Sequence, residues 1–309
     1  MNKLFTLLSS ALLATGALAQ NLENGHEYVD LGLTSGTLWA TCNVGADAPE
    51  SSGDYYAWGE VTTHYSAGGN TDSPTWKEGY SAGYNWSTYK WCNGSIDTQT
   101  KYVPQSYASD YGYEGFYDDK VTLEKADDVA SQTWGGSWVV PTHAQQKELY
   151  NECYWVWTNG YNGTSVHGYI VYKAKDANDK GTIIYDGNTP SSSYSLSDVH
   201  IFLPAAGNRW DTDLSSVGDY GYYWSSSLYG YGPNFAWYLY FNSYFVYPWD
   251  GNGRVNGFSV RPVCTVEKTP TAVESINSDN AGKVTKTIEN GQIIIIRNNK
   301  KYDLSGREL

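Results

Sequence analysis

The sequence has little positive charge. It contains 20 Lys and Arg residues against 33 Asp and Glu, and its formal net charge is −13. Residues 283–309 hold six basic and three acidic residues, so, with Lys3 set aside, residues 20–282 carry −17. A segment this acidic repels phosphate backbones, which excludes nucleic acid as an expected partner.

Long apolar runs are missing after the N-terminal segment, so no membrane span is predicted. The first nineteen residues, MNKLFTLLSSALLATGALA, place Lys3 before an apolar stretch that ends in small residues. This order is typical of a secretory signal peptide, here 1–19. No cysteine stands at the expected cleavage point, so a lipid anchor is not predicted. We expect an exported protein, located at the cell surface, in the medium or in the periplasm.

Motifs for catalysis and metal binding are also lacking. The four cysteines form no CxxC pair, and none of the five histidines stands in a local motif with Cys or Ser. Asp211–Ser215 opens like a calcium loop, but Ser216 replaces the required Gly and Tyr222 the required Glu. We therefore predict no catalytic residues, no metal and no cofactor, and a binding protein rather than an enzyme.

Aromatic side chains are abundant, with 29 Tyr and 13 Trp beside 32 Gly. Binding surfaces use such rings because they offer rigid, amphipathic contact area at small entropic cost. Residues 235–254, FAWYLYFNSYFVYPWDGNGR, are nine-twentieths aromatic. Strand alternation predicts that one face of the strand, with Phe235, Trp237, Leu239 and Phe241, is turned to the core. After Asn242, the residues Pro248, Gly251 and Gly253 predict a loop.

The rings outside the predicted core face form a candidate ligand site. A surface glycan or a protein is the expected partner, and the oligomeric state is left open. The predicted ligand-binding residues are Tyr229, Tyr231, Tyr238, Tyr240, Tyr244, Tyr247, Trp249, Asp250 and Asn252.

The order of the predicted elements gives an α+β fold in one domain, 24–266. Two short strands at 26–44 come first, followed by a loop-rich, aromatic insertion at 47–105 whose rings are expected to pack on the domain. Two short helices follow: one has an apolar stripe from Leu123 to Trp134, and the other begins at a capping box formed by Thr142 and Gln145. From Val166 onward antiparallel strands predominate, and the last is expected to return beside the first.

The character of the chain changes after residue 266. A polar linker is predicted at 267–282, and a C-terminal hairpin or sorting tail, with an IIII run, at 283–309. Cys42 and Cys264 flank the first and last predicted strands, which makes a disulfide between them one possibility. Small buried thiols are the equal alternative.

Several phrases together resemble a known family: YVDLGLTSGTLWATCNVGA, YAWGE, WGGSWVVPTHAQQKEL, FLPAAGNR, YYWSSSL and GFSVRPV. Over residues 26–264 they are similar to the Fibrobacter succinogenes major paralogous domain, found in exported bacterial proteins. The resemblance implies a C-type lectin-like fold with twisted antiparallel sheets. It also leaves two alternative functions open, a relative of formylglycine-generating enzymes and a structural component of a cell-surface appendage.

The tail has a looser resemblance of its own. Its phrases ENGQ, IIIIRN and KYDLSG are similar to the C-terminal sorting segments of Bacteroidetes type IX secretion. This implies delivery to the cell surface.

Overall fold

The computed structural model describes residues 21–108, 116–191, 193–265, 284–289, 292–297, 300–303, 307 and 309. Contacts divide the chain into two compact units, Met1–Val266 (the body) and Glu267–Leu309 (the tail). The predicted signal peptide, 1–19, and the predicted linker, 267–282, lie outside the described residues.

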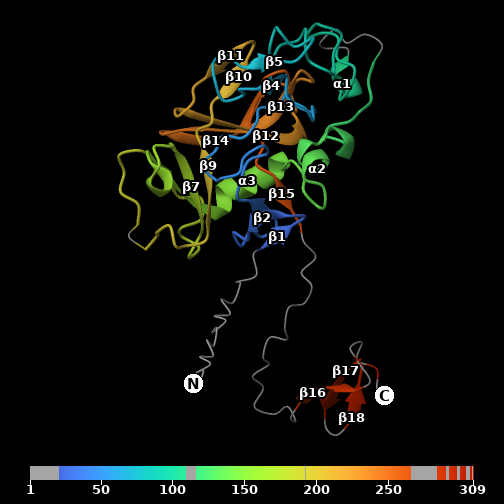
Figure 1. The fold of residues 1–309 in the computed structure, drawn as a ribbon, viewed down its shortest axis with the longest axis vertical. Helices are drawn as coiled ribbons and strands as arrows, with labels where there is room; N and C mark the ends of the chain where they lie inside the picture. The colour runs from blue at the N-terminus through green and yellow to red at the C-terminus, as the bar shows by residue number, and fades with distance from the viewer. Residues whose placement is uncertain are drawn as a thin grey trace, which may run out of the picture. The chain divides into compact units, whose positions relative to one another are not determined.

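The two ends of the body meet in one sheet. Its order is β1 (Leu22–Glu23), β2 (His26–Val29), β3 (Leu38–Ala40) and β15 (Val263–Cys264). Val263 pairs with Trp39 and Cys264 with Leu38, antiparallel. The prediction that the last strand returns beside the first is therefore confirmed (Figure 1).

Two further sheets build most of the body. One has the order β8 (Ile183–Ile184), β6 (Cys153–Thr158), β7 (Gly168–Lys173) and β9 (His200–Pro204), and its β6–β8 pair is parallel. The other is an antiparallel meander of β12 (Tyr220–Leu228), β13 (Phe235–Asn242) and β14 (Phe245–Gly253). Two small hairpins complete the body, β4 (Tyr65–Ala67) with β5 (Thr75–Trp76), and β10 (Asn208–Trp210) with β11 (Asp213–Ser215). The fold is mostly β with a few short helices, compatible with the α+β class.

The helix that follows Thr142 is confirmed, and the one before it is only partly right. Helix α3 (His143–Glu152) starts with the predicted reciprocal capping box. The predicted 123–134 helix is instead a 3₁₀ turn (Lys125–Asp127) and α2 (Val129–Thr133). Asp128 separates them, because its carboxylate accepts hydrogen bonds from Ser131 N at 2.8 Å and Val140 N at 2.9 Å. Such an N-cap conformation is extended, so the two turns cannot join. A further short helix, α1 (Gln105–Ala108), was not predicted.

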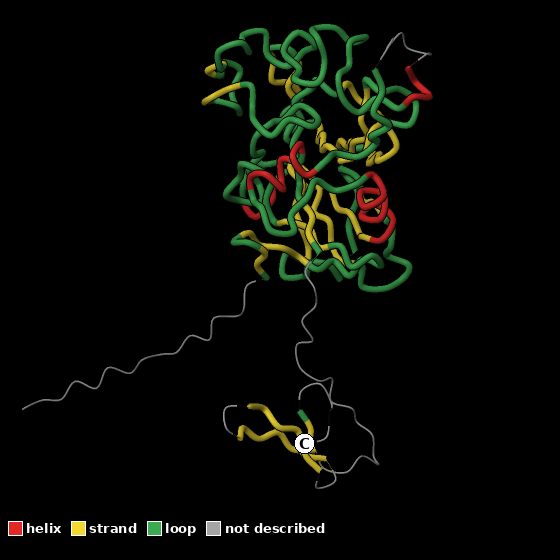
Figure 2. The backbone as a smooth tube through the Cα atoms, turned by 90° about the vertical axis from the view of Figure 1, so that its right-hand side faces the viewer, coloured by secondary structure: helices red, strands yellow, loops and turns green. Residues whose placement is uncertain are grey.

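The loop-rich insertion packs on the body through its rings, as predicted. Tyr55, Tyr84 and Tyr89 are buried, and each hydroxyl group donates to a backbone carbonyl. Tyr55 donates to Ala206 O at 2.6 Å, which joins the insertion to the end of β9. Tyr84 and Tyr89 instead donate to carbonyls within the insertion, at Tyr55 and Trp58. Figure 2 shows how much of the body is loop, so such hydrogen bonds take the place of sheet ladders here.

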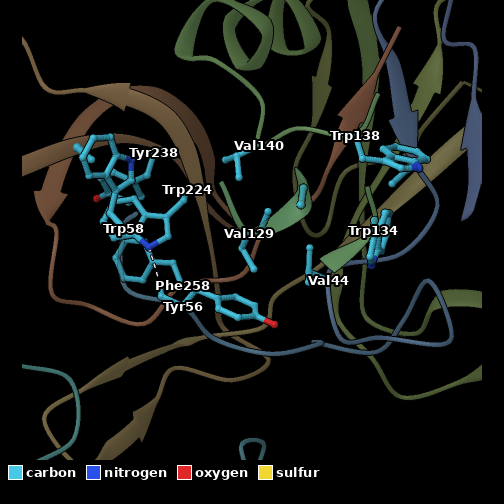
Figure 3. Close-up of a cluster of buried hydrophobic side chains, with 14 of the residues drawn as sticks. Val44, Tyr56, Trp58, Val129, Trp134, Trp138, Val140, Trp224, Tyr238 and Phe258 are labelled. Atoms are coloured by element: carbon cyan, nitrogen blue, oxygen red, sulfur yellow. Dashed lines mark hydrogen bonds between the residues drawn. The ribbon is translucent and has the colours of Figure 1, made fainter. Parts of the chain in front are cut away.

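One core lies between α2 and the β12–β14 sheet (Figure 3). The indoles of Trp58 and Trp224 are buried there and still donate hydrogen bonds, to Ser225 O at 2.7 Å and Tyr56 O at 2.8 Å. A second core, between the same sheet and the β6–β7–β9 sheet, includes Leu239 and Phe241. The β12–β14 sheet therefore buries side chains on both of its faces.

All four cysteines are free thiols, so the possible Cys42–Cys264 disulfide is not formed. The strand pairing is right, but the register is wrong for a bridge. Cys264 lies opposite Leu38 at the start of β3, whereas Cys42 lies in the bend beyond the end of this strand. The two cysteines therefore do not face each other across the sheet, as a disulfide with Cα atoms within about 7 Å requires. Burial also raises the pKa of the Cys264 thiol to about 12, which keeps it protonated and unreactive at neutral pH.

We expect peptide mapping without reduction to show no cross-linked cysteine peptides. Thiol titration of the denatured, unreduced chain should then find all four cysteines. A linked Cys42–Cys264 peptide would show that the register of β3 against β15 is wrong.

The tail forms a small antiparallel sheet of its own. Strands β16 (Val284–Glu289) and β17 (Gln292–Arg297) pair as a hairpin, and β18 (Lys300–Tyr302) adds to β17. Ile294, in the IIII run, is 5% exposed. The sheet thus gives at least this part of the run a buried position within the tail.

Candidate functional site

The segment that the sequence marked as a loop is an edge strand. β14 pairs with β13 from Asn242–Phe245 at the turn to Phe235–Gly253 at the open end. Pro248 lies in β14 at the point where the pairing register shifts, opposite the part of β13 between Tyr238 and Tyr240. An edge strand with a bulge tolerates Pro and Gly, because some of its backbone groups have no ladder partner to lose. The expected loop is therefore corrected to a strand.

Two of the predicted ligand residues lie on the inner face of this hairpin. Tyr238 is 3% exposed and packs with Trp224 and Phe258 in the core. Tyr240 is half-buried, and its ring stacks with Tyr220 at 5.6 Å. The structure thus assigns Tyr238 to the core and leaves Tyr240 partly covered, since the sheet has no fully solvated face here.

The exposed rings gather on the other side, where we define the aromatic patch. Tyr229 lies at its centre, with ring centroids 5.3 Å from Tyr231, 6.2 Å from Phe235 and 4.4 Å from Trp237. Trp249 contacts Tyr247 at 5.6 Å. The aromatic patch consists of Tyr229, Tyr231, Phe235, Trp237, Tyr247 and Trp249.

Helix α3 packs against the rings of the patch. The His143 ring stacks on Trp237 at 4.1 Å, and its Nε2 donates to Pro248 O at 2.7 Å. Burial lowers the pKa of His143, so the ring is neutral at pH 7. Further along the helix, Tyr150 meets Trp249 edge-on at 4.8 Å. These contacts join the two groups of rings through one rigid element.

Two other features fix the ring of Tyr229 and the loop beside it. A Cβ atom at Gly251 would lie 2.4 Å from the Tyr229 ring, so only glycine allows this close approach. The fully buried Arg254 donates to Pro233 O at 2.8 Å, to Lys101 O at 2.9 Å and to the Tyr89 hydroxyl at 2.9 Å. The loop between β12 and β13 is thereby tied to the insertion, and the patch is held in place from two sides.

The remaining predicted residues are elsewhere. Tyr244 is 74% exposed, but it sits at the β13–β14 turn, and the seven residue steps of β13 separate this turn from the open end by roughly 23 Å. Asp250 accepts from the Tyr238 hydroxyl at 3.4 Å, and Asn252 from Asn256 at 2.6 Å. Asp250 and Asn252 therefore belong to the Tyr238 side of the sheet, not to the patch.

Sequence reasoning missed Phe235, Trp237, His143 and Tyr150. Alternation placed the first two on a core face with Leu239, which holds for Leu239 but fails near the open end, where Phe235 is 37% exposed. His143 directly follows a recognisable cap, so its helix was predictable. Its stacking on Trp237 joins residues far apart in the chain, and no local pattern signals that.

The described residues offer no ready metal site, since no group of three or more His, Cys, Asp or Glu is suitably placed among them. Nor does any described helix have the length and apolar character needed to cross a membrane. His64 faces Glu60, His200 faces Tyr161 and His167 faces Gly218 O. Each of these contacts is a structural hydrogen bond in the body.

Among the described residues, two of the pockets on the body have room for a small molecule. One, of about 480 Å³, lies between β2 and β9 and includes Tyr28, Tyr161 and His200. The other, of about 390 Å³, is polar and lies between the β10–β11 hairpin and the β12–β14 sheet; its lining residues are Asn208, Trp210, Asp211, Asp213, Ser215, Tyr222, Asn252 and Asn256.

One family matches part of this chain, a domain of unknown function (DUF8237), over residues 176–263. The matched segment runs from before β8 to β15 and holds the aromatic patch and the polar pocket, but it spans less than half of the chain. No curated protein matches the chain, and no solved structure matches it.

Proposed function

We propose that the chain is an exported, non-catalytic binding protein whose aromatic patch docks onto a ligand at the cell surface. The observation that carries the proposal is the exposure of the rings: Tyr231 71%, Tyr247 45%, Phe235 37% and Trp249 36%. Exposed aromatic groups that adjoin one another mark interaction sites more often than scattered ones do.

The ligand class that the patch favours is a protein, with a glycan as the alternative. Tyr and Trp dominate the binding energy of protein interfaces, where they are buried against a partner with little loss of side-chain freedom. Here the rings are already held by His143, Gly251 and Arg254. Such preorganisation lowers the entropic cost of binding.

We further propose that the body is C-type lectin-like. The pairing of β3 with β15, the loop-rich insertion and the β12–β14 meander support this assignment. The signal-like N-terminus and the tail support export to the cell surface.

We expect Trp249→Ala and Tyr231→Ala to weaken ligand binding by about 1–4 kcal/mol, because each removes an exposed ring of the patch. Thermal melting of Tyr231→Ala should change little, because its ring is 71% exposed. Trp249→Ala also loses ring contacts with Tyr150 and Tyr247, so its melting temperature should fall slightly. The measurement is binding to arrays of cell-surface proteins and of glycans, followed by titration of the ligand that is found.

Tyr244→Ala is the matched control, an exposed tyrosine at the β13–β14 turn, the end of the hairpin opposite to Tyr231 and Phe235. It should bind like the unchanged chain. If Tyr244→Ala reduces binding as much as Tyr231→Ala, the site is at the turn and the patch is not the docking surface. If the array finds a glycan rather than a protein, the patch is a glycan-binding site, the alternative ligand class.

A further inference from the structure

The polar pocket is built first of all from one face of the β10–β11 hairpin. Asn208 pairs with Ser215, and Trp210 pairs with Asp213. Residues that lie directly opposite in an antiparallel ladder project to the same side, so these four side chains share one face. The residue between them, Arg209, points to the opposite side and is fully buried. The hairpin therefore has a structural face and a face turned to the pocket.

Arg209 anchors this hairpin in place. Its guanidinium donates to Gly69 O from Nε at 3.1 Å and from Nη2 at 2.8 Å, and to Thr212 O at 3.3 Å. Asp211, at the hairpin turn, accepts from Asn85 Nδ2 at 3.0 Å. The wall that carries Trp210 is thus held by the insertion on one side and by its own turn on the other.

The opposite wall comes from the β12–β14 sheet. Tyr222 contributes its ring from β12, and Asn252 and Asn256 come from β14 and the segment after it. The Asn256 side-chain NH2 group donates to Asn252 Oδ1 at 2.6 Å, and Asn256 is 7% exposed. The two amides therefore hold each other in place at the wall.

This pocket is separate from the aromatic patch. Asn252 pairs with Ala236, and the adjacent Gly251 pairs with Trp237. Successive residues of a strand face opposite sides, so Asn252 and Trp237 project from opposite faces of the sheet. A ligand in the pocket would not cover the patch, and either site could fail without the other.

The chemistry of the lining selects its ligand. It offers two carboxylates, three amides and two hydroxyl groups, while none of the described residues that line it is Lys, Arg or His. With −17 on residues 20–282, the body repels anions. Trp210 is 61% exposed and presents an indole beside these polar groups. A neutral molecule with many hydroxyl groups and one apolar face fits both features.

We propose that the polar pocket binds one neutral saccharide unit. The apolar face of the sugar ring lies on Trp210, and its hydroxyl groups hydrogen-bond with Asp213, Asn252 and Ser215. At about 390 Å³ the pocket falls in the lower part of the range of small-molecule sites. A few oriented polar groups beside an aromatic wall are how such sites fix the orientation of a ligand.

The test uses the full chain and the methyl glycosides of glucose, galactose, mannose and N-acetylglucosamine, measured by calorimetry and by ligand-observed NMR. We expect at least one of them to bind. Trp210→Ala and Asp213→Asn should each lower its affinity by about tenfold or more, as removal of a central contact does. Both side chains are exposed, so melting should stay unchanged.

Two variants serve as controls. Val217→Ala removes an apolar side chain that is 54% exposed just beyond the hairpin, and Trp249→Ala removes an indole of the patch. Both should leave glycoside affinity unchanged, which separates this proposal from the docking function of the patch.

Three results would overturn the proposal. The first is that none of the four glycosides binds. The second is that a glycoside binds equally well to Trp210→Ala and Asp213→Asn, which would place the sugar elsewhere. The third is that glucosamine binds but the neutral glycosides do not, and that salt abolishes its binding, which would make the pocket a cation site.

Discussion

Replacing Phe241 by Ala is expected to lower the free energy of unfolding by about 3–5 kcal/mol. Phe241 is 0% exposed and lies between the rings of Tyr169, at 5.4 Å, and Tyr223, at 5.8 Å. It also covers Gly221, where a Cβ atom would lie 2.0 Å from its ring. The rings around Phe241 are themselves packed in this core, so we expect most of the cavity to persist. Urea unfolding, followed by tryptophan fluorescence, measures the loss.

Phe235→Ala is the matched control, because it removes the same ring from the same strand. Phe235 is 37% exposed, at the open end of the hairpin, so it loses less burial and should cost about 1–2 kcal/mol. Equal losses for the two variants would mean that the open end of β13 is as buried as its middle, and the patch would then be core.

The strand β13 shows what alternation can and cannot predict. Leu239 and Phe241 were correctly assigned to the core from their spacing alone. Tyr238 was wrongly assigned to the surface, because alternation was taken to mean that one face of the strand is exposed to solvent. In the structure this sheet separates two cores, and Tyr238 packs in one while Leu239 packs in the other. A strand covered on both faces shows no alternation between polar and apolar residues that sequence could use.

Sequence patterns predicted an element well where a side chain hydrogen-bonds to the backbone of the same short segment. Thr142 and Gln145 form the expected cap, and the start of α3 follows from it. Asp128 is the counterexample. The apolar stripe suggested one helix, but the carboxylate caps the turn that follows, and its second oxygen binds Val140 N across the chain. The spacing of apolar residues along a helix cannot predict a hydrogen bond between residues this far apart in the sequence.

The candidate sites depend even more on distant contacts. The sequence showed that 229–252 is rich in rings, and five of its predicted residues do lie in or beside the patch or the pocket. It could not show which rings meet, because His143 comes from α3, and Arg254 ties the β12–β13 loop to the distant insertion. The polar pocket likewise needs the pairing of β10 with β11, which places Trp210 beside Asp213.

The two sites share one framework. Arg209 and Arg254 are both fully buried and both bind backbone carbonyls of the insertion, Gly69 O and Lys101 O among them. One arginine holds the hairpin of the pocket, and the other holds the loop beside the patch. The insertion is thus the part of the body against which both surfaces are positioned, so a residue pair that anchors the insertion supports both sites.

That anchor is the buried pair of Glu60 and His64. The His64 side chain is 0% exposed and that of Glu60 is 2% exposed, with His64 Nε2 2.7 Å from Glu60 Oε2. The other ring nitrogen, Nδ1, lies 2.8 Å from Gly83 O, and Glu60 Oε1 accepts from Lys90 N at 2.8 Å. The ring also stacks on Tyr84 at 4.1 Å. One pair therefore links three turns of the insertion.

Replacing Glu60 by Ala is expected to cost about 3–5 kcal/mol of unfolding free energy, the range for removing one partner of a buried pair. The loss leaves the His64 ring and the Lys90 amide without an acceptor in a buried place, so their desolvation is uncompensated.

Lys120→Ala is the matched control. It breaks another pair four residues apart, Lys120 with Glu124 at 2.8 Å, but both side chains are exposed, and exposed pairs contribute only about 0.2–1 kcal/mol. Urea unfolding at two salt concentrations distinguishes the two pairs. Salt screens the exposed Lys120–Glu124 pair and hardly affects the buried Glu60–His64 pair. If Glu60→Ala costs no more than Lys120→Ala, then water reaches the pair, and the insertion is not held by it.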